Sequence, residues 1–365
     1  VTVASLLNQQ FNIVSKGSIT NTGKITLLTK QLSNTKLNKY LIVIYADVSK
    51  IANDAMDASF NGTVSADANQ GSLAKETLTA LNLSLSRETP DFTKTSIDDK
   101  TNGIYSAKDD LGTSYYFRGN VTNNYVKFAN KYWRIIRING DGTIRMIYAG
   151  TSAHANGYND SSAMDMSIGT SEFNLFYNDN AYVGYMYGTV GSSTYAETHA
   201  NTNESTIKSQ SIDPWFQAYF DETATAKLED TVFCNDRSTV AGGNNNTLDS
   251  SFGTLGYGKN LTGYGALASA SYYTRVPNPS LVCTNANDKF TVSKSYGNGK
   301  LTYPVGLITL DEVVLAGYNT YASNNNDFKD TTNYLHTGQI YWTFSPVYVL
   351  NTGQARVGTV ALVGF

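Results

Sequence analysis

Residues 113–150, TSYYFRGNVTNNYVKFANKYWRIIRINGDGTIRMIYAG, place the tightest limit on the fold of this chain. Aromatic, β-branched and arginine residues alternate through the stretch, and clusters of Asn, Asp and Gly interrupt them. The Asn-Gly-Asp-Gly run at residues 139–142 separates two alternating segments, which is a strong hairpin signal. The stretch therefore predicts an antiparallel meander of four short strands, in the segments YYFRG, YVKFA, YWRIIRI and TIRMIYA.

The segment at residues 132–138 predicts the central strand, because both of its faces are largely apolar. A catalytic pocket would bring carboxylates or a histidine beside the arginines. The one acidic residue of the stretch, Asp141, falls in the hairpin turn instead. We therefore interpret the stretch as the structural centre of a sheet. Arg134 and Arg137 are expected to be partly buried and paired with backbone carbonyls or with carboxylates distant in sequence.

Three segments predict helices. Residues 72–86 carry leucines at helical spacing behind a capping serine. Residues 309–317 read as a capping box, Thr-x-x-Glu, with a terminating glycine. Residues 213–230 begin with Asp213 as the expected cap and proline at the first helical position. The buried stripe of this helix is expected to be Trp215, Phe216, Tyr219 and Phe220.

The remaining segments favour strands and loops, so we expect a mostly β (α+β) protein. Residues 1–71 contain β-branched runs and predict a partial β-sandwich, which has too few strands to be complete. Residues 72–104 predict a helix and a linker. Residues 105–365 predict the main domain, with further strands at residues 301–309 and 340–365.

Composition limits the function classes. Charged residues make up 16% of the 365 residues and the net charge is −3, so the basic surface that nucleic acid requires is missing. No apolar run is long enough to predict a membrane span. The 26 tyrosines outnumber the 15 phenylalanines, which is typical of a neutral, hydrogen-bonding, secreted surface. We expect an extracellular protein, processed so that it begins at Val1.

The two cysteines, Cys234 and Cys283, are expected to pair in an oxidising compartment. Closing the loop between them would stabilise the fold by about 4 kcal/mol in the chain-entropy model. Two free, buried thiols are the alternative. Neither cysteine lies in a spacing that is typical of zinc ligands.

No motif of a known catalytic class is present: the chain has no nucleophile elbow, P-loop or dinucleotide fingerprint. We therefore expect no enzymatic activity and no cofactor. The histidines are far apart in sequence and are expected to be surface or hydrogen-bonded loop residues: His154, His199 and His336. Calcium is a candidate ion for Asp160, Asp165 and Asp179, but solvated turns explain these residues better.

Tyrosines gather with Ser, Gly and Asn in two long loop regions, residues 151–210 and 240–275. This composition is typical of adaptable recognition surfaces, of contacts between subunits, and in part of a core. The candidate recognition or contact residues are Tyr158, Tyr182, Tyr185, Tyr187, Tyr257, Tyr264, Tyr272 and Tyr273.

The opening stretch, together with DTVFCNDR, LTYPVGLITLDEVVLAG and YWTFSP, resembles a group of secreted proteins of Gram-positive gut bacteria. That group is similar to the C-type-lectin-like superfamily. The resemblance covers about residues 105–346 and implies a small twisted sheet, two helices and long loops. Residues 38–68 resemble the camelysin and TasA-type sandwich of biofilm fibre proteins.

These features favour a subunit of a pilus-like or biofilm-fibre-like filament on the bacterial surface. An incomplete sandwich exposes a sheet edge to which a neighbouring copy can add a strand. The expected donor is the apolar segment with Val1, Val3, Leu6, Leu7, Phe11, Ile13 and Val14, although packing within its own chain is an alternative. A lectin-like adhesin that binds glycan or protein through its tyrosine-rich loops is the second hypothesis, and a formylglycine-generating type of enzyme is the third.

Overall fold

The computed structural model describes residues 73–86, 90, 92, 102–157, 165–175, 186–187, 203–236, 278–317, 332–349 and 355–360. The chain divides into two compact units, Val1–Ala68 and Asn69–Phe365, and all the described residues belong to the second unit. The sandwich strands and the donor segment predicted within residues 1–71 therefore lie outside the described residues.

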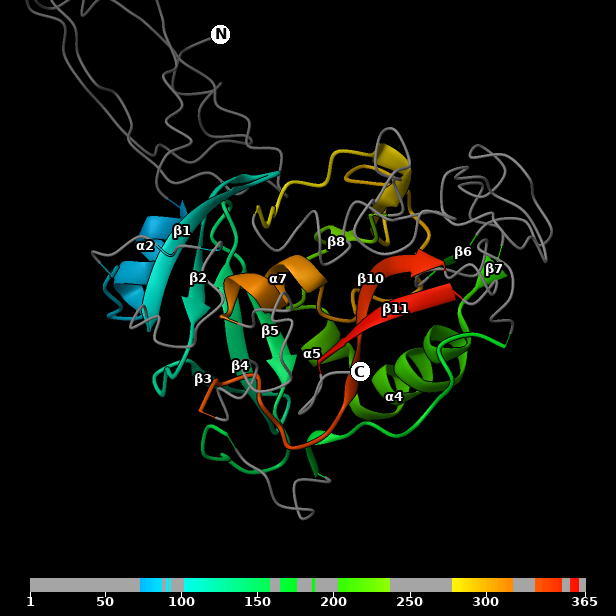
Figure 1. Cartoon of the computed structure of the whole chain (residues 1–365), viewed down its shortest axis with the longest axis horizontal. Helices are drawn as coiled ribbons and strands as arrows, with labels where there is room; N and C mark the ends of the chain where they lie inside the picture. The colour runs from blue at the N-terminus through cyan, green and yellow to red at the C-terminus, as the bar shows by residue number, and fades with distance from the viewer. Residues whose placement is uncertain are drawn as a thin grey trace, which may run out of the picture. The chain divides into compact units, whose positions relative to one another are not determined.

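An antiparallel five-stranded sheet is the largest sheet among the described residues of the second unit (Figure 1). Its strands are β1 (Gly103–Asp109), β2 (Gly112–Arg118), β3 (Tyr125–Phe128), β4 (Lys131–Ile138) and β5 (Ile144–Tyr148). The four strands β2–β5 were predicted, whereas β1 was not. Its residues, GIYSAKD, alternate only weakly, and its burial depends on pairing with β2 along its whole length.

The prediction of a simple meander is wrong, because β2 pairs with β4 and skips β3. The pairs are Tyr115 with Ile138 and Tyr116 with Arg137, at the C-terminal half of β4. β3 pairs with the N-terminal half of the same strand. The eight-residue β4 is long enough to accept both neighbours, since the loop at residues 119–124 returns the chain to the other half of β4.

The prediction that β4 is central is confirmed. It pairs with β2, β3 and β5, and its residues from Trp133 to Ile138 are buried on both faces. The predicted turn after it closes with a hydrogen bond from the Asn139 N–H to the Thr143 carbonyl, 2.8 Å long. Gly142 adopts a φ of 87° in this turn, which glycine reaches without steric cost.

The helix predicted at residues 72–86 is shorter in the structure, where α2 spans Leu73–Ala80. Asn82 takes a left-handed φ of 54°, which ends the helix. The Ser86 N–H then donates to the Ile104 carbonyl at 2.8 Å, so the chain after the helix bonds to β1. Ala74 and Leu78 of α2 pack into the core against the sheet.

The helix predicted at residues 213–230 is correct in place and wrong in detail. A π-helical turn, η5 (Lys208–Ile212), precedes α4 (Asp213–Tyr219), and a separate short helix, α5 (Glu222–Thr225), follows. Asp213 does not cap α4; its carboxylate binds Lys208 instead. The predicted stripe is only partly buried, because Phe216 is 2% exposed whereas Tyr219 is 54% exposed.

The capping box is confirmed at α7 (Leu310–Leu315). The Thr309 hydroxyl accepts from the Glu312 N–H at 3.1 Å, and the Glu312 carboxylate accepts from the Thr309 N–H at 3.0 Å. At the other end, Arg118 of β2 donates to the carbonyls of Val314 and Leu315. A cation at the last carbonyls of a helix is favourable, so both ends of α7 are fixed by side chains.

Short pairs of strands complete the described unit. They are β6 (Met186–Tyr187) with β7 (Asn203–Glu204), β8 (Phe233–Cys234) with β9 (Lys289–Phe290), and β10 (Tyr341–Val349) with β11 (Ala355–Val360), and a 3-10 turn, η7 (Ala286–Asp288), precedes β9. The β-structure predicted near the end of the chain is confirmed by the β10–β11 hairpin. The strand predicted at residues 301–309 is wrong. This segment makes isolated backbone bonds only, such as that from the Phe344 N–H to the Ile308 carbonyl, and Pro304 and Gly306 interrupt it.

The described residues thus form an α+β unit with antiparallel sheets and few helices. One apolar cluster lies between the central sheet and the helices α2 and α7. A second includes Ile207, Ile212 and Leu301 together with Phe290 and Phe344. Within the described ranges, no helix has the length and apolar character needed to cross a lipid bilayer.

Candidate functional site

A small hollow opens where β1 and β4 end, beside β8 and the first turn of α7. It encloses about 40 Å³, which is room for a few water molecules and far below the volume of an ordinary small-molecule pocket. Its charged lining consists of Asp109, Asp110, Arg137, Arg145, Asp236, Asp311 and Glu312. The hollow is therefore polar, and its floor is made by side chains from distant parts of the chain.

Two arginines and two carboxylates form what we call the ionic centre: Arg137, Arg145, Asp109 and Glu312. Glu312 Oε1 lies 2.5 Å from Arg145 Nε and 3.1 Å from Arg137 Nε. Arg137 Nη1 lies 3.1 Å from Asp109 Oδ2. Each of the four side chains is at most 10% exposed, so the charges balance one another away from water.

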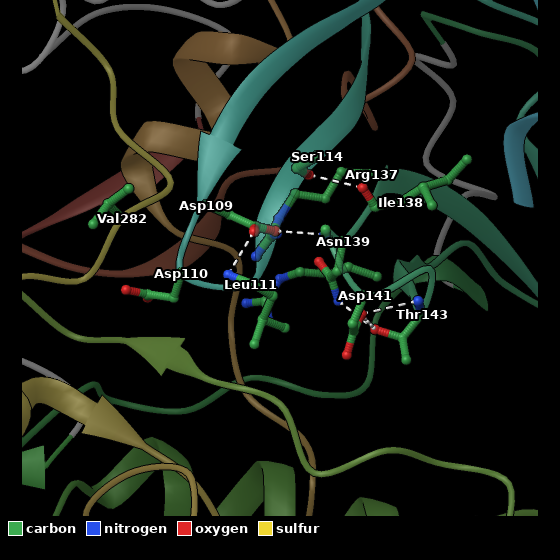
Figure 2. Close-up of polar contacts among 12 residues, drawn as sticks. Asp109, Asp110, Leu111, Ser114, Arg137, Ile138, Asn139, Asp141, Thr143 and Val282 are labelled. Carbon is green, nitrogen blue, oxygen red and sulfur yellow. Dashed lines mark hydrogen bonds and ion pairs between the residues drawn. The ribbon is translucent and has the colours of Figure 1, made fainter. Parts of the chain in front are cut away.

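Asp109 connects two turns of the sheet, as Figure 2 shows. Its Oδ1 accepts from the Leu111 N–H at 2.8 Å, and its Oδ2 accepts from the Gly140 N–H at 2.9 Å. The β1–β2 turn and the β4–β5 turn approach each other closely here. A Cβ on Gly140 would lie 2.4 Å from the Gly112 nitrogen, so only glycine fits at this position.

The pKa values of the ionic centre follow from burial and pairing. Burial alone would raise the pKa of Glu312, but Arg145, Arg137 and the Thr309 N–H outweigh burial and lower it. Burial lowers the pKa of Arg145, and Glu312 opposes that shift. The Arg145 guanidinium also lies 4.1 Å from the centre of the Phe233 ring, which adds a cation–π contact.

These contacts decide what the ionic centre can do chemically. Both oxygens of Asp109 and both oxygens of Glu312 already accept hydrogen bonds or ion pairs. These contacts stabilise both carboxylates as anions and make Glu312 less basic than a free carboxylate. The ionic centre holds β1, β4, β5 and α7 together.

The disulfide lies beside the hollow and joins Cys234 to Cys283, with Cα atoms 5.6 Å apart. This is the pairing that the sequence predicts, and neither cysteine is free. The Cys283 N–H donates to Asp110 at 3.0 Å, and Asp110 pairs with Lys289 at 2.9 Å. The bridge thus connects β8 to the segment that approaches the β1–β2 turn.

The expectation for the two arginines of β4 is confirmed. Arg134 donates to the Val121 carbonyl at 3.2 Å and to Asn124 Oδ1 at 2.6 Å, while Arg137 pairs with Asp109 and Glu312. The sequence argument expected distant carboxylates but did not identify Asp109 and Glu312 as the partners of Arg137. The available signal for Glu312 was its position: it is the glutamate of a capping box, and the helix that it begins has an apolar face.

A histidine, an aspartate and a serine meet in the loop after β5. His154 Nε2 lies 2.6 Å from Asp165 Oδ1 and 3.4 Å from the Ser152 hydroxyl. Both contacts use the same ring nitrogen, so the ring cannot relay a proton from serine to aspartate as a catalytic triad does. Burial favours a higher pKa for Asp165, but hydrogen bonds from Thr151 and the contact with His154 lower it.

Two of the three histidines lie among the described residues, in different surroundings. His154 is the hydrogen-bonded loop residue that we expected, whereas His336 is buried at 7% exposed and is not a surface residue. His199 lies outside the described residues, as do two of the three aspartates considered for calcium, Asp160 and Asp179. Among the residues with a described placement, no group of three or more His, Cys, Asp or Glu side chains is arranged to hold a metal ion.

The N-terminal half of β4 contributes to a second region, which we call the aromatic surface. It consists of Trp133, Tyr148, Trp215, Tyr219 and Phe220. Ring centres lie 5.5 Å apart for Trp133 and Tyr148, 5.1 Å for Tyr148 and Trp215, and 5.5 Å for Trp215 and Tyr219. Exposure rises from 7% at Trp133 to 54% at Tyr219. Lys131 Nζ lies 4.1 Å above the Tyr219 ring, so a cation borders this aromatic surface.

Of the eight tyrosines that the sequence predicted as contact residues, one lies among the described residues. Tyr187 lies on β6, where its backbone pairs with Asn203. The other seven tyrosines lie outside the described residues: Tyr158, Tyr182, Tyr185, Tyr257, Tyr264, Tyr272 and Tyr273. Sequence reasoning did not find the aromatic surface, although the spacing of Trp215 and Tyr219 on one helix face was a signal for it.

Comparison of the chain with protein-family models, with curated proteins and with solved structures finds no match. The case for a function therefore rests on the ionic centre, the aromatic surface and the edges of the sheets.

Proposed function

We propose that this protein is an extracellular, non-enzymatic subunit of a surface filament that assembles by β-strand addition. The observation that carries the proposal is β11 (Ala355–Val360), which pairs with β10 alone among the described strands. An edge strand of this kind offers a row of backbone N–H and C=O groups to a further strand. The proposed donor is the apolar segment at residues 1–14 of a neighbouring copy.

A head-to-tail contact of this kind does not close on itself, so it produces a fibre. The disulfide supports the extracellular location, because such bonds persist in oxidising compartments. The mutual pairing of the charged side chains in the ionic centre supports a structural role for the buried charges. The antiparallel α+β unit is compatible with a C-type-lectin-like fold carried by a bacterial surface protein of the Gram-positive type, and a TasA-like sandwich before it remains part of the proposal.

The filament proposal is tested with the purified full chain and with a chain lacking residues 1–14. Negative-stain microscopy and size-exclusion chromatography should find fibres of the full chain and a folded monomer of the shortened chain. A full chain that stays monomeric at high concentration contradicts the proposal. Fibres of the shortened chain, or its failure to fold, contradict strand donation by residues 1–14.

A second experiment tests β11 itself by placing proline at each of its six positions in turn. Successive N–H groups of a strand point to opposite edges, so one alternating set bonds to β10 and the other faces outward. Proline removes the N–H donor. One set should destabilise the hairpin, and the other should block fibre growth while leaving the melting temperature unchanged. If neither set affects fibre growth, β11 is not the acceptor edge.

The aromatic surface favours a second function, a lectin-like module that binds glycan or protein. Exposed aromatic rings give an apolar face to which the apolar face of a sugar ring can stack, and Tyr and Trp are enriched in such contacts. Binding to a glycan array should be saturable and should fall in Tyr219→Ala. Tyr296→Ala is the matched control, because Tyr296 is 46% exposed and lies outside the aromatic surface. Equal binding by both variants would exclude this surface as the site.

A further inference from the structure

A lysine is fully buried between two carboxylates at the start of α4. Lys208 has no exposed side-chain surface, and its Nζ lies 2.6 Å from Glu204 Oε1 and 2.6 Å from Asp213 Oδ2. The Thr302 hydroxyl lies 3.2 Å from the same nitrogen. One amine therefore contacts a carboxyl group on each side, and its whole side chain is withdrawn from water.

The π-helical turn brings the lysine and the aspartate together. The Asp213 N–H donates to the Lys208 carbonyl, which is the i→i+5 bond of a π-helix. This wider turn places residues five apart on nearly the same face, whereas an α-helix would turn their side chains away from each other. Single π-turns are rare and occur frequently at functional sites, so this one calls for an explanation beyond helix formation.

The environment of Asp213 favours the neutral acid. Burial raises its pKa, although Lys208 partly opposes the shift. Its second oxygen, Oδ1, is buried and has no hydrogen-bond partner among the described residues. The flanking side chains Ile207 and Ile212 belong to an apolar cluster. A carboxyl group that is protonated here is a better electrophile than a carboxylate, and a lysine amine without water around it is a better nucleophile than a hydrated one.

We propose that Lys208 and Asp213 condense to an intramolecular amide, with Glu204 as the proton carrier. Glu204 first passes one proton from the Lys208 ammonium to the Asp213 carboxylate, which becomes the neutral acid, and the free Nζ then attacks Cγ of Asp213. The new N–C bond forms as the bond from Cγ to the hydroxyl oxygen breaks, and Glu204 carries the second proton from the nitrogen to that hydroxyl, which leaves as water. An ammonium and a carboxylate thus become an amide and one water molecule, with no change of oxidation state.

The positions around the amide suit this reaction. The Glu204 side chain is 40% exposed, so it can exchange protons with solvent, whereas the reacting pair is shielded. The residue after Asp213 is Pro214. Proline has no N–H, so Asp213 cannot lose water by cyclising onto the next backbone nitrogen. A loss of water located at this aspartate would therefore identify the side-chain amide.

The test is the intact mass of the full chain after reduction and alkylation of the disulfide. The folded protein should be lighter than its sequence by one water molecule. Trypsin should fail to cut after Lys208, because the amide removes the positive charge that it recognises. Fragmentation should give no backbone breaks between residues 208 and 213, since the ring holds both pieces together.

Three variants locate the reaction. Lys208→Arg keeps the charge and should have the full sequence mass, and Glu204→Gln should also keep the full mass, with an unchanged fold because residue 204 is partly exposed. Asp213→Asn should be lighter by one ammonia in place of one water, since the leaving group changes. A cooperatively folded wild-type chain with the full sequence mass overturns the proposal. So does a water loss that persists in Lys208→Arg, because it must then come from elsewhere.

Discussion

Strand β4 carries two regions of opposite chemistry. At its C-terminal half, Arg137 belongs to the ionic centre, where four buried charged side chains from β1, β4, β5 and α7 satisfy one another. At its N-terminal half, Trp133 is the buried base of the aromatic surface, whose rings become exposed towards Tyr219. Each charged side chain of the ionic centre is held by its ion-pair partners. The second region has spare surface, so stability and binding are expected to separate along a single strand.

The largest expected effect is the loss of the charge at the ionic centre. Glu312→Gln keeps the shape of the side chain but leaves Arg145 without its ion pair and Arg137 with Asp109 alone. Breaking a buried pair on one side costs about 3–5 kcal/mol, and chemical denaturation should measure a loss of this size. Glu222→Gln, at an exposed position on α5, is the matched control. Equal losses in the two variants would mean that the ionic centre adds nothing to stability.

Lowering the pH should remove the stabilisation by the Glu312 charge from the wild-type protein as well. The folded pKa of Glu312 lies below its ordinary value of 4.5, so its contribution is fully present above about pH 4.5 and is lost as the pH falls through the folded pKa. Glu312→Gln should therefore lose less stability in acid than the wild type. All other ionisable groups are the same in both proteins, so the difference curve isolates Glu312. Parallel curves would refute this assignment.

Removing the disulfide beside the hollow should have a somewhat smaller effect. Replacing both Cys234 and Cys283 by alanine should lower the free energy of unfolding by about 2–4 kcal/mol, since the unfolded chain regains the freedom that the bridge removes. Denaturation curves measure the loss. As a separate check, alkylation of the native protein without reduction should modify neither cysteine, and two modified thiols would contradict the bridge.

The smallest effect on stability is expected at the aromatic surface. Tyr219→Ala should change the free energy of unfolding by no more than about 0.5 kcal/mol, as is usual for exposed positions. Trp133→Ala, at the buried base, should cost about 3–5 kcal/mol. The pair of variants therefore tests whether the aromatic surface divides into a structural base and a free outer part. A large loss in Tyr219→Ala would show that the outer part is structural as well.

Sequence patterns found the elements whose signals are local. The Asn-Gly-Asp-Gly turn, the alternating strands beside it and the capping box of α7 each depend on residues only a few positions apart. The prediction of a strand at residues 301–309 was wrong because a strand does not depend on local signals alone. Its apolar run is compatible with a buried strand, but a strand also needs a paired neighbour, which the run cannot reveal.

The non-local features could not be read in this way. The pairing of β2 with β4, in place of β3, depends on how the loop at residues 119–124 turns. The ionic centre needs Glu312, which lies 175 residues after Arg137 in the chain. The aromatic surface joins a helix to two strands. In each case the partner is set by the assembled fold, so only the residue types could be anticipated.

The ion pairs between α7 and the sheet also affect when the sheet can become stable during protein synthesis. The arginines of β4 and β5 leave the ribosome long before Glu312, and at about 5–20 residues per second the delay is roughly 10–35 s. During that interval Arg137 can already pair with Asp109 of β1, whereas the burial of Arg145 is costly without Glu312. The sheet therefore gains the full stability of the ionic centre only after α7 has been synthesised.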